Sequence, residues 1–523
     1  MRSDWLDSAV FYEIYPTSFY DSNGDGVGDI PGIIEKLPYV AQLGCNAVWL
    51  NPCFCSPFLD GGYDITDYYR VDPRFGTNDD LRRLFETARA LGIRVLLDLV
   101  MGHTSDRHPW FAASCKEERN EFTDAYIWSD NLDAEHCEAR FICGRSERPH
   151  MYKVNYYATQ PALNYGYYRP TKSWQMPMDA PAALQNRERL KDVCAFWLDM
   201  GAAGFRVDMA HNMVKGDVRY RGNIRFWREV LDDLHARYPD AVFLPEWNDP
   251  QKTIGKAGFD LAFYYPFGYT KANGSDRDDA HIYEGTYISE QSRLFSVFLG
   301  PYLHAVRKIN RIGGYQSLHL GNHDTIRLSR SRSDDMIRVL WASYMTLPGV
   351  PLIYYGDELG MRYQPLKSKD GGYQRTGART PMQWDNTKNN GFSTTDGVLN
   401  LPVEGPDSPY TVAAEAQDPH STYNTVKTLA HYKRSFDCLR AHAPFQVLHT
   451  GHKKDGNPFI YRRKGRDGTL VVVLQPRRAA VRVPMRKYLK DGAYDCLLRQ
   501  NADWDGQTLA CSGVSFALFY RKG

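Results

Sequence analysis

The stretch GFRVDMAHNM, residues 204–213, decides the fold because it resembles a buried strand that ends in a charged pair. Its first residues are mostly apolar, yet Arg206 and Asp208 interrupt them two positions apart. Alternate residues of a strand point to the same side, so these two side chains are expected to face together. Polar groups at the carboxyl end of a buried strand are typical of the active face of a barrel.

Short apolar runs bounded by turn residues occur eight times in the chain. Their hydrophobicity is continuous rather than alternating, which is typical of parallel strands buried on both faces. Helical patterns such as 79–92 and 189–203 precede several of them and have a glycine near their C-terminal ends. This order predicts an α/β fold, a (β/α)8 TIM barrel. The expected strands lie within residues 9–16, 45–52, 93–100, 203–210, 241–247, 259–265, 315–324 and 349–358.

Two segments depart from the barrel pattern. Residues 104–180 hold far more chain than one crossover helix needs, so we expect an inserted subdomain after the third strand. After about residue 435, short alternating runs predict a C-terminal antiparallel β domain. The predicted domains are a catalytic barrel at 1–103 and 181–435, the insert at 104–180, and a β-sandwich at 436–523.

The composition excludes some classes of function. Among 523 residues, 64 Lys and Arg face 62 Asp and Glu, a balance that does not favour a nucleic-acid partner. No apolar run is long enough to cross a membrane and no signal-like segment begins the chain, so we expect a cytoplasmic protein without a membrane partner. Aromatic residues make up 13% of the chain, which suits stacking against the apolar faces of sugars.

Carboxylates follow three of the expected strands. Asp208 ends the fourth, Glu246 the fifth and Asp324 the seventh, so all three are expected on one face of the barrel. Glycoside hydrolysis needs two carboxyl groups, one as nucleophile and one as proton donor. Arg206 is expected to keep Asp208 ionised and oriented. The alternative interpretation is a structural ion-pair network at the strand ends.

The motifs around these residues resemble, in their joint order over nearly the whole chain, the α-amylase family of glycoside hydrolases, glycoside hydrolase family 13. They are most similar to its oligo-1,6-glucosidase and α-glucosidase branch. The matching stretches are DSNGDGVGD (21–29), GGYDITDYYRVDPRFGT (61–77), DLVMGHTSD (98–106), GFRVD (204–208), PEW (245–247), GNHD (321–324), LIYYGDELGM (352–361) and RTPMQWD (379–385).

The resemblance implies double displacement with retention, through a β-glucosyl-enzyme. It implies that Asp208 is the nucleophile, Glu246 the general acid/base and Asp324 the stabiliser of the transition state. It implies no organic cofactor. The residues that it places around the bound sugar are Tyr63, Asp64, His103, Arg206, His323 and Arg379.

The loop DSNGDGVGD predicts a cation site, because oxygen donors recur at alternate positions. The predicted ligands are Asp21, Asn23, Asp25, the Val27 carbonyl and Asp29. The loop is not an EF-hand, since Gly32 stands where the bidentate glutamate belongs. The resemblance implies a structural Ca²⁺, and magnesium or a metal-free turn are the alternatives.

Several positions differ from the family pattern, among them His211 and Asn212, which stand where many endo-acting amylases have a lysine and a histidine. Gly102 replaces an asparagine that helps bind a second calcium in amylases, and Ala162 replaces an aspartate in QPALN. Met209 matches neither the valine typical of α-1,6-active glucosidases nor the threonine of α-1,4-active ones. The linkage, the second calcium and the oligomeric state are therefore left open.

The expected function is a retaining, α-glucosidase-like hydrolase of α-glucosidic bonds, with a short oligosaccharide or small α-glucoside as its substrate. A transglycosylase or isomerase, trehalose-synthase-like or sucrose-acting, is one alternative on the same scaffold. An α-amylase-like or neopullulanase-like specificity is another. A non-catalytic, membrane-tethered relative is disfavoured because all three carboxylates are present.

Overall fold

The computed structural model describes residues 3–129, 140–264, 300–330, 332–450, 458–490 and 492–523. Eight parallel strands form one sheet in the order β10-β9-β5-β2-β1-β13-β12-β11. Each strand lies within one of the predicted runs, so the predicted strands are confirmed. They are β1 (Phe11–Ile14), β2 (Ala47–Leu50), β5 (Arg94–Leu99), β9 (Gly204–Val207), β10 (Val242–Pro245), β11 (Leu261–Tyr264), β12 (Tyr315–His319) and β13 (Val350–Tyr354).

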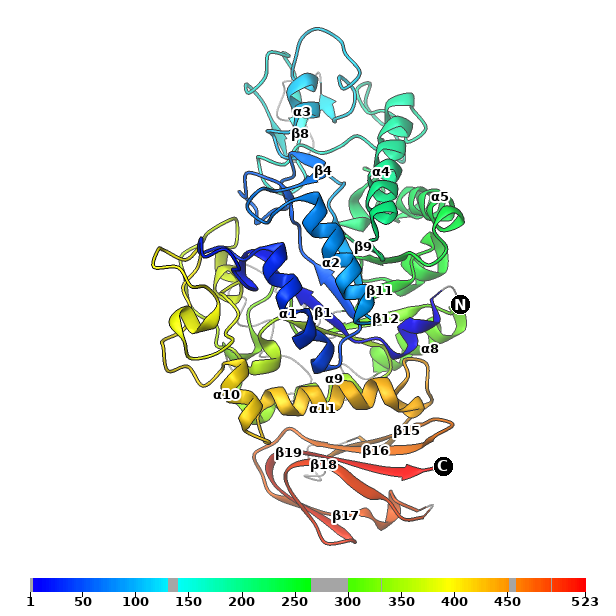
Figure 1. Ribbon diagram of the computed structural model, residues 1–523. Coiled ribbons are helices and arrows are strands. Elements are labelled where there is room, and N and C mark those ends of the chain that lie inside the picture. Colours follow the sequence, from blue (N-terminus) through cyan, green and yellow to red (C-terminus); the bar gives the residue numbers. More distant parts are fainter. Residues whose placement is uncertain (1–2, 130–139, 265–299, 331, 451–457, 491) are drawn as a thin grey trace.

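The sheet closes between its two outer strands, β10 and β11. The backbone N–H of Asp260 donates to the Phe243 carbonyl at 3.3 Å, and Asp260 Oδ2 accepts the Phe243 N–H at 2.9 Å. Helices surround the closed sheet, which makes it the predicted TIM barrel (Figure 1). They are α1 (Ile30–Leu43), α2 (Asn78–Ala90), α4 (Pro181–Met200), α5 (Arg221–Arg237), α6 (Pro250–Lys252), α8 (Gly300–Ile312), α9 (Asp334–Thr346), α10 (Val412–Gln417) and α11 (Thr422–Ser435).

The insert is built on the carboxyl end of β5. It contains α3 (Pro109–Ser114) and a small antiparallel sheet of β6 (Trp128–Ser129), β8 (Met151–Lys153) and β7 (Phe141–Ile142). A second short pair, β3 (Phe54–Cys55) and β4 (Asp67–Val71), follows β2. The Leu163 N–H donates to the Gly102 carbonyl at 3.2 Å, so the QPALN segment is attached directly to the end of the third barrel strand.

The C-terminal region is an antiparallel sheet at the other end of the molecule, separated from the barrel by α9 and α11 (Figure 1). The described strands form one hydrogen-bonded sheet, and the β-sandwich stays a prediction. Strand β19 of this sheet is 15 residues long. It pairs with β17 at its start and with β16 at its end. The strands are β14 (Phe445–Thr450), β15 (Phe459–Lys464), β16 (Gly468–Gln475), β17 (Val481–Pro484), β18 (Asp495–Trp504) and β19 (Thr508–Lys522).

None of the helices in the described ranges combines the length and apolar character that a membrane crossing requires.

A glycine fixes the position of the strand that carries the charged pair. Gly204 lies opposite Val242 of β10 and has a φ of +145°. A Cβ at this position would lie 1.9 Å from the Val242 carbonyl oxygen. Any side chain would therefore push β9 away from β10, so the glycine that begins GFRVD is required by close backbone approach.

We expect Gly204→Ala to lower the free energy of unfolding by at least about 3 kcal/mol, because the added methyl overlaps backbone that cannot move without breaking the barrel. Gly92→Ala is the matched control: Gly92 has a φ of +73° but no atom within 4 Å of an added Cβ. That control should lose only about 1–2 kcal/mol through backbone strain. Equal losses in denaturant titrations of the two variants would contradict the close-packing explanation.

Candidate active site

One buried guanidinium, that of Arg206, organises the site. Its Nη1 donates to Asp98 Oδ1 and to Asp208 Oδ1, both at 2.9 Å, and its Nη2 lies 3.0 Å from Glu246 Oε2. Burial raises the pKa of the Asp208 carboxyl, and the Arg206 guanidinium opposes that rise by stabilising the charged form. Carboxylates from three neighbouring strands thus converge on one arginine. The sequence predicted the contact of Arg206 with Asp208 and placed Glu246 on the same face of the barrel.

Glu246 is the more open of these two carboxylates. Its side chain is 26% exposed, whereas that of Asp208 is 9% exposed. The backbone N–H of Met209 donates to Glu246 Oε2 at 2.9 Å. Met209 has a φ of 42°, a left-handed conformation that is unusual for a residue with a side chain. This strained residue, directly after Asp208, therefore helps to orient Glu246.

Asp324 accepts hydrogen bonds from two arginines of the segment after β13. Its Oδ1 contacts Arg375 Nη1 and Arg379 Nη2, the latter at 3.3 Å, and His323 Nε2 lies 3.4 Å away. Although burial opposes ionisation, His323, Arg375 and Arg379 hold the pKa of Asp324 well below its usual range. Asp324 is therefore an anion, able to accept hydrogen bonds from sugar hydroxyls.

Tyr63 connects the two halves of the site. Its hydroxyl donates to Asp98 Oδ2 at 2.7 Å, where the Trp49 indole also donates at 3.0 Å. Its ring stacks on the His323 ring with 5.1 Å between centroids and an interplanar angle of 9°. His323 Nδ1 in turn lies 2.7 Å from Glu13 Oε1. Tyr63, Arg206 and His323, which the resemblance places around the bound sugar, are thus brought together.

His103 lies at the junction of barrel and insert. Its Nε2 donates to the Tyr63 carbonyl at 2.8 Å. Burial, together with the nearby Lys215 ammonium, lowers the pKa of His103 to about 4, so the ring is neutral near pH 7. Lys215 Nζ donates to Asn155 Oδ1 at 2.8 Å and to the Asn212 carbonyl at 2.5 Å. Asn155 Nδ2 donates to the Gly102 carbonyl at 2.7 Å. Lys215 therefore connects the insert to the barrel beside Gly102, the glycine that differs from the family pattern.

Asp64, by contrast, directs its carboxylate to its own loop. It accepts hydrogen bonds from the Ser56 hydroxyl at 2.9 Å and from the backbone N–H of Leu59 at 2.9 Å and of Asp60 at 3.2 Å. The structure places Asp60 nearer to the other site residues, since its Oδ1 lies 3.7 Å from Arg375 Nη2. The sugar-binding role of Asp64 stays a prediction.

Besides Lys215, the polar residues of the site that were not identified from the sequence include Glu13, Asp60 and Arg375. Glu13 lies within the first strand, and its contact with His323 spans 310 positions of the chain. Asp60 and Arg375 lie in loops, where no periodicity shows which side chain faces the other residues of the site. A carboxylate inside the otherwise apolar run 9–16 was the one available signal, because a buried charge requires a partner.

The loop 21–29 uses its side chains to hold its own backbone. Asp21 Oδ1 and Oδ2 accept the N–H groups of Gly24 and Gly26, each at 2.7 Å, and Asp29 Oδ1 accepts that of Gly32 at 2.6 Å, which caps α1. Asp21 and Asp29 are buried, and within the described residues neither pairs with a lysine or arginine. Burial raises the pKa of Asp29.

This loop fits a cation only in part. A bound cation would stabilise Asp21 and Asp29, two buried carboxylates without a positively charged partner among the described residues. Asn23 and Asp25 are exposed, however, and both accept backbone N–H groups, at 2.9 Å from Asp25 and Val27 respectively. In the part of the chain that the structure describes, no group of three His, Cys, Asp or Glu side chains could hold a metal ion.

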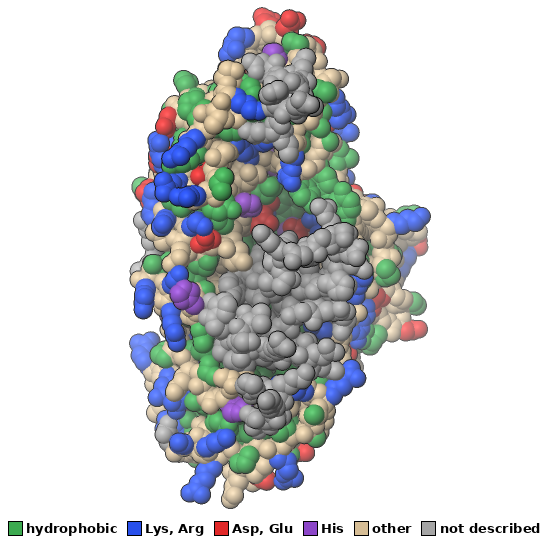
Figure 2. Space-filling model, turned by 180° about the vertical axis from the view of Figure 1, so that it is seen from behind, with side chains coloured by type: hydrophobic (Ala, Val, Ile, Leu, Met, Phe, Trp, Pro, Cys, Tyr) green, Lys and Arg blue, Asp and Glu red, His purple; other side chains and the backbone are tan. Residues whose placement is uncertain are grey.

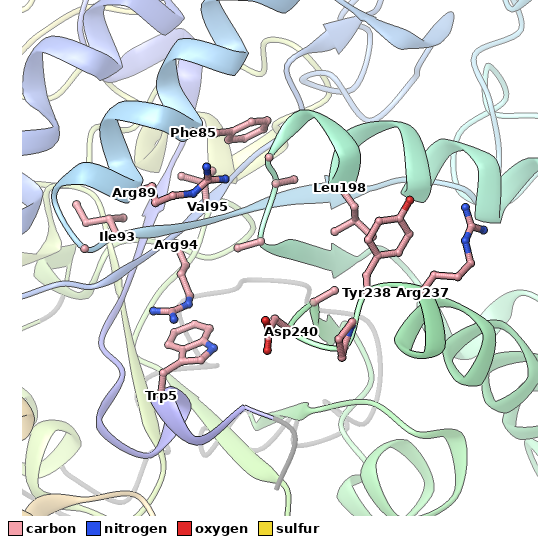
Figure 3. Close-up of a pocket in the computed structure, with 16 residues that line it drawn as sticks. Trp5, Phe85, Arg89, Ile93, Arg94, Val95, Leu198, Arg237, Tyr238 and Asp240 are labelled. Carbon is pink, nitrogen blue, oxygen red and sulfur yellow. The ribbon is translucent and has the colours of Figure 1, made fainter.

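A different hollow opens at the amino-terminal ends of β5, β9 and β10 (Figure 3). It has a volume of about 710 Å³ and is lined by three arginines, Arg89, Arg94 and Arg237. Arg89 and Arg237 lie in the last turns of α2 and α5, where cations complement the helix dipole. No predicted site residue lines this hollow, so we assign it to the end of the barrel that serves stability.

The candidate site lies at the opposite, carboxyl end of the strands. The face shown in Figure 2 has a small group of acidic side chains in a hollow near the middle of the molecule.

The comparisons with known proteins all indicate the same family. The profile described as "Alpha amylase, catalytic domain" matches residues 13–442. The chain is 32% identical over 435 residues to alpha-amylase 3 of Dictyoglomus thermophilum, covering 81% of this chain and 77% of that protein. It is 29% identical over 542 residues to the oligo-1,6-glucosidase of Heyndrickxia coagulans, covering 90% and 92%.

Two further similarities concern enzymes with other names. The chain is 33% identical over 442 residues to the trehalose synthase/amylase of Mycolicibacterium smegmatis, covering 76% of this chain and 70% of that protein. The crystal structure of a trehalulose synthase from Pseudomonas mesoacidophila superposes with a TM-score of 0.78 and 25% identity, covering 99% of both chains.

We expect Lys215→Met to destabilise the junction by about 2–4 kcal/mol, because the Asn155 and Asn212 oxygens lose a charged donor in a buried place. Denaturant unfolding measures this loss, and limited proteolysis should show faster cleavage within 104–180. Lys116→Met is the matched control, since Lys116 is an exposed lysine of the same insert. A stability equal to that of the control would contradict the anchoring role of Lys215.

Proposed function

This chain belongs to the α-amylase family of glycoside hydrolases, and from that premise we propose that it is a retaining α-glucosidase acting on short oligosaccharides. The observation that carries the proposal is the shared contact of Arg206 with Asp208 and Glu246. Two carboxylates bound to one guanidinium lie close together. This favours direct attack by one of them over attack by a water molecule held between them.

In the proposed first step, Asp208 attacks the anomeric carbon of the glucosyl unit. Arg206 favours the ionised form of the attacking oxygen and opposes the rise in the Asp208 pKa that burial causes, since its Nη1 is 2.9 Å away. Glu246 protonates the departing oxygen through the carboxyl oxygen that does not contact Met209 and Arg206. The bond to Asp208 forms as the glycosidic bond breaks, and the leaving sugar departs with the proton from Glu246.

In the second step, Glu246 removes a proton from water, which attacks the anomeric carbon and releases Asp208. The product then has the same anomeric configuration as the substrate. Asp324 and His323 are proposed to hold hydroxyls of the sugar ring while it distorts. The fixed charge of Asp324, maintained by Arg375 and Arg379, gives hydrogen bonds that strengthen as the ring becomes positively charged.

A second candidate is transfer of the glucosyl unit to another sugar hydroxyl instead of water. The similarity to a trehalose synthase/amylase and to a trehalulose synthase favours this alternative. The first step is identical, and only the acceptor in the second step differs. Hydrolysis and transfer therefore use the same residues for attack and protonation and differ only in their products.

We further propose that the loop 21–29 binds a structural Ca²⁺. Asp21, Asn23, Asp25, Asp29 and the Val27 carbonyl supply oxygen atoms, which are the ligands that Ca²⁺ prefers. The support is the burial of Asp21 and Asp29 beside the start of α1. The ion would offset their charges and supply no catalytic chemistry, because neither residue contacts the three catalytic carboxylates in the described structure.

The catalytic assignment predicts that Asp208→Asn and Glu246→Gln each lower kcat about a thousandfold or more while the folded structure is kept. Glu86→Gln, an exposed carboxylate on α2, should leave kcat unchanged. Maltose, isomaltose, trehalose, sucrose and maltoheptaose are the substrates, with products analysed by chromatography and NMR. The α-anomer of glucose is expected first. New disaccharides would instead establish transfer. Full activity of Asp208→Asn would refute the assignment of Asp208 as the nucleophile.

The calcium proposal predicts that excess Ca²⁺ raises the melting temperature by a few degrees relative to protein treated with a chelator. Asp25→Ala should abolish this shift because it removes an exposed ligand. Asp396→Ala, another exposed aspartate, should keep it. Identical melting temperatures with Ca²⁺ and with the chelator would contradict a calcium site in this protein.

A further inference from the structure

The charge of the chain is distributed unevenly between the barrel and the C-terminal region. Residues 436–523 contain 16 Lys and Arg and 7 Asp and Glu, so this region has a net charge of +9. The remaining residues contain 48 Lys and Arg and 55 Asp and Glu, which gives −7. The near balance of the whole chain thus conceals a basic region attached to an acidic one. Such an asymmetry is informative about binding partners rather than about the fold.

The C-terminal sheet has an inner and an outer face. On β19, Leu518 belongs to the core shared with α11, whereas Phe519 packs with Val483 and Met485 in a separate cluster. This second cluster includes the start of the turn η12 (Met485–Lys487), which follows β17 on the side of the sheet away from the barrel (Figure 1). The outer face therefore points away from the barrel and its carboxylates.

A hollow beside η12 is lined by basic side chains. Its volume is about 730 Å³, and three exposed cations line it, Arg486, Lys487 and Lys490. The other lining residues carry no charge: Pro484, Leu489 and Gly492. Within the described part of the chain, no acidic side chain belongs to the lining. The hollow thus combines positive charge with apolar walls.

A fourth cation, Arg521, borders the same hollow. A Cβ at Gly492, whose φ is +134°, would lie 3.3 Å from Arg521 Cδ. Arg521 comes two positions after Phe519 on β19, so its side chain leaves the sheet on the outer face. Its guanidinium carbon lies 5.8 Å from the centroid of the Tyr494 ring. Residues from η12, from the chain after it and from β19 therefore place four cations around one opening.

These four cations have no anionic partner in the structure as described. Neither an ion pair nor a side-chain hydrogen bond connects them to another described residue. Arg521 Nε and the Tyr494 hydroxyl are in addition buried without a hydrogen-bond partner among those residues. Unpaired donors beside unpaired positive charges indicate an acceptor that the described chain does not supply.

Protection of a sheet edge explains only part of this charge. β17 pairs on one side alone in the described sheet, and its exposed Arg482 and Pro484 are residue types that prevent pairing at such an edge. Arg486, Lys487 and Lys490 lie beyond the end of that strand. A solvated edge also requires neither a hollow nor buried donors without partners. These features favour binding of a ligand.

The lining indicates the class of anion. A lipid surface is too flat to enter a hollow, and nucleic-acid bases stack on aromatic rings, none of which lines this one in the described structure. Inorganic polyphosphate has no apolar surface that would gain from contact with Pro484 and Leu489. A sugar ring that carries sulfate, phosphate or carboxylate groups has both apolar C–H faces and charged acceptors. An acidic sugar chain therefore fits best.

We propose that the hollow beside η12 binds an acidic polysaccharide through its four unpaired cations, and that the C-terminal region thereby anchors the enzyme to such a polymer. The site lies at the end of the molecule opposite the insert (Figure 1). It shares no residue with the candidate active site. The inference therefore does not depend on the substrate or the reaction proposed above.

The test is calorimetric binding of a heparin oligosaccharide of defined length, at about 0.1 M salt so that exposed charges are only partly screened. The combined variant Arg486→Gln, Lys487→Gln, Lys490→Gln should weaken this binding about tenfold or more, because it removes three charge-assisted contacts. Arg521→Gln alone should weaken it about threefold for the same reason. An unchanged affinity in the combined variant would overturn the site.

A matched control separates the site from the net charge. It removes three exposed cations of the barrel and the insert: Arg70→Gln, Lys116→Gln and Lys256→Gln. Its affinity for heparin should stay within about twofold of the parent, since distant charges are screened. Equal weakening by the two combined variants would show attraction by net charge alone and would contradict the proposal. Circular dichroism should give all variants the melting temperature of the parent.

Other probes test the ligand class at the same salt concentration. Neutral dextran, polyphosphate, duplex DNA and phosphatidylserine vesicles should each bind at least about tenfold more weakly than heparin. A parent that does not bind heparin, or that binds any of these four as tightly, would overturn the inference. Hydrolysis of the small glucosides tests the proposed function separately, because a protein that binds heparin without hydrolysing them contradicts that function alone.

Discussion

The contact of one buried guanidinium with three carboxylates is the interaction on which the rest of the site depends. Arg206 carries one positive charge, whereas Asp98, Asp208 and Glu246 carry three negative charges when ionised. Burying such an imbalance is unfavourable unless further donors compensate it. The fold supplies them through the Tyr63 hydroxyl and the Trp49 indole on Asp98 and through the Met209 N–H on Glu246. These donors are fixed before any substrate binds, which is the arrangement that electrostatic catalysis requires.

The barrel places the carboxylates proposed to react and the loop residues beside them on different elements. Asp98, Asp208 and Glu246 lie on or directly after hydrogen-bonded strands, and Gly204 lets β9 approach β10 closely enough to set their spacing. Asp60 and Arg375, in contrast, lie in loops, and the insert holds that region through Tyr157 and Gln160. Loops on a rigid sheet can change in length and composition without disturbing carboxylates at the strand ends. The chain is similar over most of its length to proteins named amylase, glucosidase and trehalose synthase, as expected if such loops differ among them.

Sequence reasoning identified the strands better than it identified the loops. All eight buried runs became barrel strands, because continuous apolar character and flanking turns depend on local chemistry alone. The side of a strand is likewise readable from alternation, which is why Arg206 and Asp208 were correctly expected to face together. The turn around Asp60 and Asp64 has no such periodicity. The sequence therefore does not show that Asp60 faces Arg375 whereas Asp64 accepts hydrogen bonds within its own loop. Glu13 and Lys215 were missed for a related reason, since their partners lie far away in the sequence.

The junction at His103 has a consequence for how the site is assembled. A lysine of the chain, Lys215, supplies the positive charge between the insert and the barrel, next to the Gly102 backbone that hydrogen-bonds to Asn155. A charge attached to the chain is present whenever the protein is folded, whereas a bound ion depends on its concentration. His103 is kept neutral there, so it can donate to the Tyr63 carbonyl at any pH near neutrality. The alignment of Tyr63 with Asp98 and His323 is therefore set by covalent geometry and buried hydrogen bonds. Any cation bound at residues 21–29 would stabilise the start of α1 without adjusting Asp208, Glu246 or Asp324.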